Sequence, residues 1–428
     1  MKKKRFLTTL AAAALAVSML SAIPASAANY PEAKWASGDT KELKKYLVLD
    51  KSANVPEAKF SYSIAAGTPA NYTTPSGATG TIAAYAGVDA DKITIADAEF
   101  TSSSVTTNGA ADDGITNSTA KKYAVDTFSV DFSAVKFKEP GVYRYVLTEV
   151  GAGDTDNLGT GISHVGNYQK TLDVYVKDTD GTLSVQSYIL YNSVIDTAPA
   201  ISDDTALDDK VDRTDTANVE KTDGFVNEYS SKSLSFAKKV TGNQGSKDKY
   251  FKFTVAIKNA KGATLTIDSD KSSFEQTTTQ NSATIYNTAD MNAANGVDQN
   301  NKIAGQQLNI SSNSATYDFY LQNDQYITID GLPVGAEYEI TEAAEEYTST
   351  ATADETGKKF TIGTIEFKDE TSGTIGTADV AAGFTNDKDG TIPTGVILSI
   401  AGPAVVGLAV AGGLIFMLIK RKKEDAED

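Results

Sequence analysis

Two lysines stand where the sequence pattern would bury them in a β-strand. Lys238 shares its parity with the apolar residues of segment 234–240, and Lys45 with those of segment 43–49. Side chains of a strand alternate between its two faces, so both lysines point the same way as these apolar neighbours. An unpaired ammonium in a core costs several kcal/mol or loses its proton. Each lysine therefore requires a polar partner in the folded chain.

A glutamate and an asparagine follow each lysine in the same order. Glu149 and Glu342 each end a strand-like segment, in phase with its apolar residues. Asn227 and Asn386 each end a Phe-x-Asn tripeptide further along the chain. The separation from lysine to glutamate is the same in both copies. This repeated order predicts a tandem repeat of one domain type.

The segments between these residues have the pattern of short β-strands. Apolar residues alternate with polar ones between turn residues, and no sustained helical periodicity appears away from the two ends of the chain. The pattern indicates an all-β chain of two sandwiches, an N-terminal domain at 28–230 and a C-terminal domain at 231–390. Residues 65–123 and 267–315 are rich in small or polar side chains, and we expect them to be long insertions, largely looped.

The first residues read as a secretory leader. A basic cluster at 2–5 precedes an apolar stretch at 7–20, and Ala25-Ser26-Ala27 supplies small residues for cleavage. The apolar stretch is too short to span a bilayer, so we predict a signal peptide at 1–27 and a mature chain that begins at Ala28.

The last residues form a tripartite tail at 391–428. Thr-Ile-Pro-Thr-Gly at 391–395 precedes an apolar run at 396–419 and a basic cluster at 420–423. The run is long enough to be a transmembrane helix, and the basic cluster would stay on the cytoplasmic side. The whole tail resembles a cell-wall sorting signal of Gram-positive bacteria. This resemblance implies that a sortase cuts between Thr394 and Gly395 and passes the Thr394 carboxyl to an amine.

Charge and cysteine content exclude several classes of protein. The chain carries a formal net charge of −17. This becomes about −21 once both ends are removed, because the leader holds four basic residues and the tail four of each sign. Such an acidic protein is not expected to bind nucleic acid or an anionic membrane. The chain has no cysteine, so any covalent reinforcement must use other side chains.

The two Lys, Glu and Asn sets could supply that reinforcement. Burial disfavours the charged forms of both lysine and glutamate, which leaves a nucleophilic amine beside a carboxyl group that can shuttle protons. Our hypothesis is two isopeptide bonds, Lys45–Asn227 and Lys238–Asn386, each releasing ammonia, with Glu149 and Glu342 as the respective catalytic groups. The alternative is a snorkelling lysine and a buried ion pair in each domain.

The motifs around these residues resemble the streptococcal, T-antigen-like major pilins. The matching segments are LSFAKKVTGNQG, GFVNEY, YRYVLTE, YEITE, GFTN and TIPTG. The resemblance implies two stacked immunoglobulin-like sandwiches, self-forming isopeptide bonds and head-to-tail polymerisation by a pilin-specific sortase. The chain departs from the family in its longer first domain and its 267–315 segment. The YPKN-type motif of other pilus lineages is missing.

Polymerisation requires an acceptor lysine on the next subunit. Lys221 precedes Asn227 closely, near the place where this family has its linking lysine, and is our candidate. Lys210 and Lys177 are alternatives, and Lys221 could also be an ordinary solvated lysine.

These inferences favour the structural shaft subunit of a covalent pilus. Its partners would be sortase, identical subunits, accessory pilins and peptidoglycan. The precursor would cross the cell membrane once before the protein is anchored in the wall at the cell surface. The alternative is a wall-anchored adhesin or minor pilin whose binding loops are 65–123 and 267–315. An extracellular enzyme is a third class.

We expect no cofactor and no metal site. His164 is the only histidine and is predicted to lie in a glycine-rich loop without partners, which disfavours a histidine-based triad. Segments 178–181 and 387–390 resemble the start of a calcium loop but lack the spacing to a bidentate glutamate, so they are expected to be a turn and a linker.

Overall fold

The computed structural model of the chain describes nine segments. These are residues 40–69, 71–73, 81–110, 114–150, 158–196, 221–268, 307–343, 347–350 and 359–390. The predicted signal peptide and the sorting signal lie outside them, as does most of the 267–315 segment. In the described segments, no helix has the length and apolar character needed to cross a bilayer.

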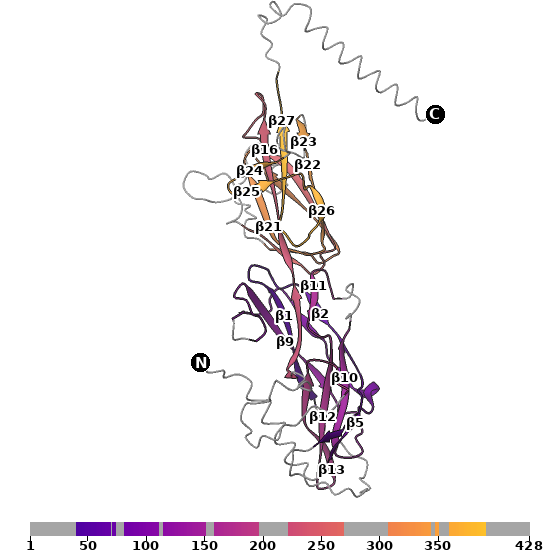
Figure 1. The fold of residues 1–428 in the computed structure, drawn as a ribbon. Coiled ribbons are helices and arrows are strands. Elements are labelled where there is room, and N and C mark those ends of the chain that lie inside the picture. The colour runs from indigo at the N-terminus through magenta and orange to yellow at the C-terminus, as the bar shows by residue number, and fades with distance from the viewer. Residues whose placement is uncertain are drawn as a thin grey trace, which may run out of the picture.

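The described chain is built of strands, as the sequence predicts. Two β-sandwiches follow one another along the long axis of the molecule (Figure 1). A single-turn 3-10 helix, η1(Ala90–Lys92), is the one helical element of the described segments. The prediction of tandem all-β sandwiches is therefore confirmed.

Two sheets face each other in the first sandwich. One sheet has the order β11(Ile162–Val165), β15(Gly224–Tyr229), β1(Thr40–Asp50), β9(Lys121–Asp131), β6(Thr94–Ile95), with β8(Thr106–Asn108) also paired to β9. The other has the order β14(Lys221–Thr222), β13(Thr182–Tyr191), β12(Gln169–Thr179), β10(Gly141–Glu149), β5(Thr81–Ala86), β4(Asn71–Thr73), with β3(Tyr62–Ala66) paired to β10. A separate ribbon joins β2(Ala58–Phe60) to β7(Ala98–Phe100).

The second sandwich repeats this plan with fewer strands. One sheet has the order β19(Gln307–Asn309), β18(Thr264–Ile267), β21(Tyr326–Pro333), β16(Ser231–Thr241), β27(Val380–Asp387), β23(Thr348–Thr350). The other has the order β20(Ser314–Leu321), β17(Phe251–Lys258), β22(Glu337–Glu342), β26(Ser372–Thr374). A ribbon joins β24(Phe360–Ile362) to β25(Ile365–Phe367).

The first and last strands of each sandwich are parallel neighbours. In β1 and β15, Lys45 stands opposite Phe225. In β16 and β27, Lys238 stands opposite Phe384 in the same relation. Each of these phenylalanines lies two residues before the asparagine of its Phe-x-Asn tripeptide. The internal repeat thus extends from the sequence to the strand register.

The alternating pattern produces two separate apolar cores. Along β16, the in-phase residues Leu234, Phe236 and Val240 are at most 3% exposed, and the corresponding residues of β1 are equally buried. Burial of one such side chain contributes roughly 1.5–3 kcal/mol. The lysine of each strand is carried into the core by its position between these residues.

Part of the 65–123 segment is integrated into the sheets, contrary to our expectation of a largely looped insertion. β5 pairs with β10 in parallel, and β6 and β8 both pair with β9. The small side chains of this segment gave only weak strand signals, whereas backbone pairing does not depend on side-chain size.

A single residue connects the sandwiches. β15 ends at Tyr229 and β16 begins at Ser231. The Tyr229 hydroxyl donates a hydrogen bond to the Gly331 carbonyl at 3.1 Å. The Glu57 amide donates to the Gly262 carbonyl at 2.8 Å. These two hydrogen bonds, together with the one-residue connection, restrict the orientation of one sandwich relative to the other.

Candidate functional site

Lys45, Glu149 and Asn227, hereafter the first triad, meet inside the first sandwich. β1 and β15 supply the lysine and the asparagine from one sheet, and β10 supplies the glutamate from the other. The Lys45 Nζ contacts Glu149 Oε1 and lies 2.5 Å from Asn227 Oδ1. The Lys45 side chain is 0% exposed, which excludes a snorkelling lysine.

Lys238, Glu342 and Asn386, hereafter the second triad, meet inside the second sandwich. The Lys238 Nζ lies 2.8 Å from Glu342 Oε1, and Asn386 Nδ2 donates to the same carboxylate oxygen at 2.8 Å. The side chains of Lys238 and Glu342 are 0% and 1% exposed. The lysine is the central group of the first triad, whereas the carboxylate is the central group of the second.

An aromatic ring lies against each lysine. The Lys45 Nζ is 4.0 Å from the centroid of the Phe60 ring, and the Lys238 Nζ is 4.5 Å from the centroid of the Phe251 ring. Both phenylalanines are fully buried. The rings exclude water from the amines while the negative face of each ring attracts an ammonium group.

The two amines have similar and strongly lowered pKa values. Burial lowers the pKa of Lys45 to about 8, an effect that the neighbouring Glu149 carboxylate partly opposes. Burial lowers the pKa of Lys238 to about 8 in the same way, opposed by Glu342. At neutral pH roughly a tenth of each lysine is therefore the free amine. A free amine held against a carboxamide is a nucleophile next to an acyl carbon.

His164 was missed as a member of this site. The structure places it in β11, directly opposite Asn227 of β15, and its Nδ1 lies 3.0 Å from Glu149 Oε2. The prediction of a loop residue without partners is therefore wrong. His164 and Ile162 have the same parity, but a strand of four residues is too short to stand out between glycines.

Lys170 is a second group near the first triad that the sequence analysis did not single out. It is 2% exposed and donates from Nζ to Asn192 Oδ1 at 2.5 Å. Its charge also contributes to the lowering of the Lys45 pKa, after the larger effect of burial. Lys170 is in phase with Leu172 and Val174, so its burial had the same sequence signal as that of Lys45.

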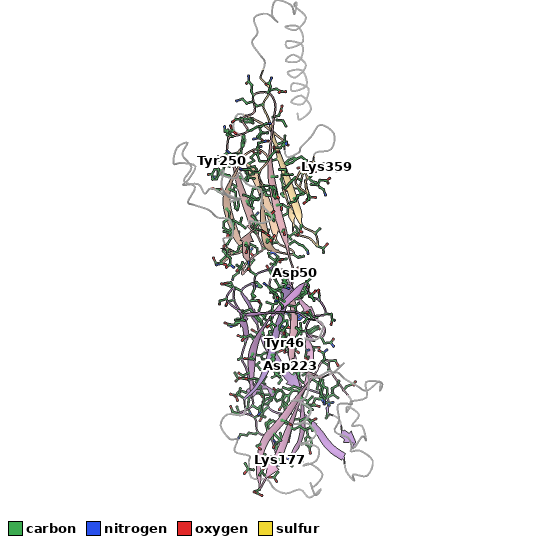
Figure 2. The ribbon with its side chains drawn as sticks, turned by 90° about the vertical axis from the view of Figure 1, so that its left-hand side faces the viewer. Tyr46, Asp50, Lys177, Asp223, Tyr250 and Lys359 are labelled. Atoms are coloured by element: carbon green, nitrogen blue, oxygen red, sulfur yellow. The ribbon has the colours of Figure 1, made fainter. Side chains whose placement is uncertain are left out.

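Of the remaining predicted site residues, the structure describes Lys221 and Lys177 and brings neither into a triad. Lys221 lies in the edge strand β14 and is exposed. Lys177 lies near the end of the first sandwich that points away from the second (Figure 2). Lys210, Thr394 and Gly395 lie outside the described residues.

Neither calcium-like segment holds a metal-binding arrangement. Asp178–Gly181 forms the turn between β12 and β13, where the Gly181 amide donates to Asp178 Oδ1 at 2.8 Å. In the segments that the structure describes, no group of three His, Asp or Glu side chains could coordinate an ion.

Known sequences and structures align with most of the chain. The family described as a domain of unknown function (DUF7601) matches residues 232–388. The pilin of Streptococcus pyogenes serotype M1 is 26% identical over 311 residues, which cover 72% of this chain and 75% of that protein.

Solved structures that align with the chain include two streptococcal pilins. A mutant of the major pilin from Streptococcus pyogenes has 21% identity and a TM-score of 0.46, over 83% of this chain and 100% of that one. The T3.2 major pilin of the same species has 20% identity and a TM-score of 0.45, over 85% and 100%.

On the 26% identity over most of both proteins, the chain is homologous to the major pilin of Streptococcus pyogenes.

Proposed function

We propose that the chain is the structural shaft subunit of a covalent, sortase-assembled pilus, and that each sandwich forms an internal Lys–Asn isopeptide bond. The observation that carries the proposal is the repeated triad, buried at the same register between the first and last strands of each sandwich. The pilin relative supports the assignment to a pilus. The chain is a building block and not an enzyme, because each triad consumes its own side chains.

The proposed reaction needs no external reactant. A proton moves from the Lys45 ammonium to the Glu149 carboxylate, and the free Nζ attacks Cγ of Asn227. The new Nζ–Cγ bond forms while the Cγ–Nδ2 bond breaks, and the carboxyl group gives its proton to the leaving nitrogen, which departs as ammonia. The carboxylate then takes the second proton from Nζ, so the products are the neutral isopeptide, ammonia and a protonated Glu149. Lys238, Glu342 and Asn386 would react in the same way. The packed core supplies the proximity that free amine and amide lack.

Lys221 is the proposed acceptor for the next subunit. Strand β14, which carries it, pairs with β13 in one sheet, whereas β15 pairs with β1 in the other. The chain therefore crosses from sheet to sheet at Asp223. The Lys221 side chain is exposed and so accessible to a partner, while desolvation by the neighbouring chain lowers the pKa of its amine and favours the nucleophilic form.

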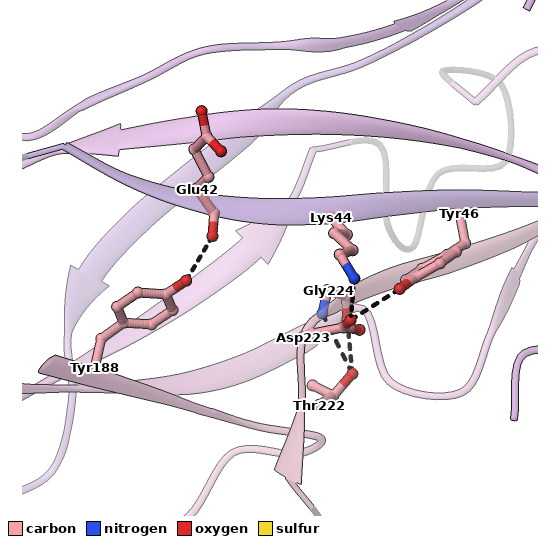
Figure 3. A network of polar contacts seen from close by, with 7 residues as sticks. All are labelled: Glu42, Lys44, Tyr46, Tyr188, Thr222, Asp223 and Gly224. Carbon is pink, nitrogen blue, oxygen red and sulfur yellow. Dashed lines mark hydrogen bonds and ion pairs between the residues drawn. The ribbon is translucent and has the colours of Figure 1, made fainter. Parts of the chain in front are cut away.

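A set of polar contacts holds this crossing in place (Figure 3). Asp223 Oδ2 accepts hydrogen bonds from Lys44 Nζ at 2.9 Å and from the Tyr46 hydroxyl at 2.8 Å. Gly224 packs so closely that an added Cβ would lie 1.7 Å from the Lys44 carbonyl oxygen. The bend is thereby fixed against β1, and β14 presents Lys221 from a defined position.

The connectivity defines a short covalent route for tension. Sortase would break the Thr394–Gly395 bond and join the Thr394 carboxyl to Lys221 of the next subunit. Force applied at Lys221 then runs along β15 and into β16 as far as Lys238. The bond to Asn386 passes it directly to β27, so residues 239–385 carry no load.

Substitution of the acceptor tests the assembly. In a cell-wall extract on a denaturing gel, the wild type should give a ladder of covalent multimers that disappears without sortase. Lys221→Ala should abolish the ladder, and the control Lys177→Ala should keep it. A ladder unchanged in Lys221→Ala would remove Lys221 as the acceptor. No ladder in the wild type would instead favour a singly anchored adhesin or minor pilin.

A further inference from the structure

His164 faces the first triad from the side opposite Lys45. Glu149 Oε1 contacts the Lys45 Nζ, and Glu149 Oε2 lies 3.0 Å from the His164 Nδ1. The His164 side chain is 17% exposed. Each oxygen of the proposed catalytic carboxylate therefore has its own basic neighbour.

The imidazole has no other polar partner in the described part of the chain. Its Nε2 is buried and makes no hydrogen bond, and neither does the buried Glu149 Oε2, so the 3.0 Å contact between Nδ1 and Oε2 is one of proximity and charge. The Tyr168 ring packs on the imidazole with centroids 5.5 Å apart. Since His164 stands opposite Asn227, the strand pairing brings it to the triad. Its one polar contact is with the group that must change protonation state.

The second triad has no counterpart of this histidine. In β23 and β27, Ser349 stands opposite Asn386, which is the position that His164 takes opposite Asn227 in the first sandwich. A serine side chain does not change its charge in the physiological pH range. At this equivalent position, the first sandwich therefore has a titratable residue and the second a non-titratable one.

We propose that His164 is a positioning residue for Glu149 and that its protonation suppresses bond formation in the first sandwich only. This inference rests on the isopeptide bonds of the proposed function. Histidine is the side chain that ordinarily changes charge between about pH 5 and 8. Formation of the first bond therefore acquires a pH dependence that the second bond does not have.

The reason lies in the proton transfer that starts the reaction. Glu149 must pass from carboxylate to carboxylic acid as it takes the proton of Lys45. A neutral imidazole carries no charge that would favour the carboxylate over the carboxylic acid. An imidazolium stabilises the carboxylate alone. A charged His164 thus keeps the proton on Lys45 and removes the nucleophile.

Several other ionisable groups surround this contact. They are Lys45 from β1, Tyr62 from β3, Glu149 from β10, Lys170 from β12 and Tyr168 from the turn before it.

The test follows both bonds in the same full-length protein. The starting material is chain in which neither isopeptide bond has formed, kept unfolded in denaturant. It is refolded in buffers that range from about pH 8 down to about pH 5. Samples are quenched over time, digested, and each cross-linked peptide pair is quantified by mass spectrometry. The second bond is the internal reference, because both lysines lose reactivity together as the pH falls.

The wild type should show the rate of the first bond falling about tenfold relative to the second on acidification across this range. His164→Ser, which places at this position the residue type of the second sandwich, should remove the relative fall. A wild-type ratio that is constant with pH, or a fall that persists in His164→Ser, would overturn the inference. Absence of both bonds in the wild type would instead refute the proposed function.

Discussion

The two sandwiches present the same triad in different surroundings. In both, a lysine of the first strand lies opposite the phenylalanine of the Phe-x-Asn tripeptide, beneath an aromatic ring, with its pKa lowered to about 8. Among the residues that the structure describes, only the first triad has a histidine at its carboxylate and a second buried lysine near its amine. Three strands supply each triad: β1, β10 and β15 in the first sandwich, and β16, β22 and β27 in the second. His164 and Lys170, the additional ionisable groups of the first sandwich, are not part of the triad and can therefore change the conditions under which it reacts.

The two proposed bonds also differ in their place along the chain. Lys221 lies close to Asn227 in sequence, so tension between Lys221 and the C-terminus leaves the first sandwich without passing through the Lys45–Asn227 bond. The Lys238–Asn386 bond, by contrast, bridges the whole second sandwich. The first bond is expected to stabilise its sandwich, and the second to bear load as well.

The largest predicted difference is mechanical. The chain has no cysteine, so Lys221→Cys and Asp389→Cys supply two unique handles for force spectroscopy. With both bonds present, the molecule should not lengthen by unfolding. Asn386→Ala should release residues 239–385 as roughly 50 nm of added length.

Asn227→Ala is the matched variant for this pulling geometry. It removes the other bond, which is off the route of tension, and should add no length. A long extension in Asn227→Ala would contradict the proposed route.

Thermodynamic stability should not distinguish the two bonds. By analogy with a disulfide, closing either loop stabilises its sandwich by about 5 kcal/mol, because the entropy of closure depends only weakly on loop length. Asn227→Ala and Asn386→Ala should each lower the free energy of unfolding of their own sandwich by about this amount in denaturant titrations. A several-fold difference between the two would show that one bond had not formed in the wild type.

A second buried ion pair should make the first sandwich more sensitive to charge removal. Arg144 and Asp173 are both 0% exposed and lie 2.8 Å apart. Asp173→Asn leaves the arginine charge uncompensated and should cost about 3–5 kcal/mol. Asp318→Asn, which breaks the half-exposed Lys252–Asp318 pair of the second sandwich, should cost under about 1 kcal/mol by the same denaturant titration. Equal costs would contradict the difference in burial.

The smallest predicted effect is a pH dependence of the free energy of unfolding. Only a sandwich that lacks its isopeptide bond should show it. In Asn227→Ala, Lys45 has a pKa of about 8 when folded, against an ordinary value of 10.5. Between these values the unfolded chain holds the proton and the folded chain does not, so stability should rise with pH, by about 1–3 kcal/mol. Lys238 in Asn386→Ala should behave alike.

Wild-type protein is the control for this pH dependence. An isopeptide nitrogen does not titrate, so unfolding free energies of the wild type should lack the rise. The same slope in wild type and variants would indicate that both lysines remain free amines.

Parity, together with the repeated order of Lys, Glu and Asn, was sufficient to identify the residues of the triads. Lys45 and Lys238 were recognised because each interrupts an apolar alternation, and Glu149 and Glu342 because each ends one. His164 was not recognised, because its neighbour across the sheet is Asn227, and strand pairing between distant segments leaves no local signal. The pairing of β5 with β10 was missed for the same reason. Lys170 carried the parity signal of Lys45 but had no repeated copy to draw attention to it.

The mass of the intact, mature protein tests the central claim most directly. Two isopeptide bonds predict a denatured chain that is lighter than its sequence by two molecules of ammonia, with cross-linked peptides that join Lys45 to Asn227 and Lys238 to Asn386. Glu149→Ala and Glu342→Ala should each leave one bond unformed, so the mass deficit of each variant should be one molecule of ammonia instead of two. A wild-type mass equal to that of the unmodified sequence would contradict the account.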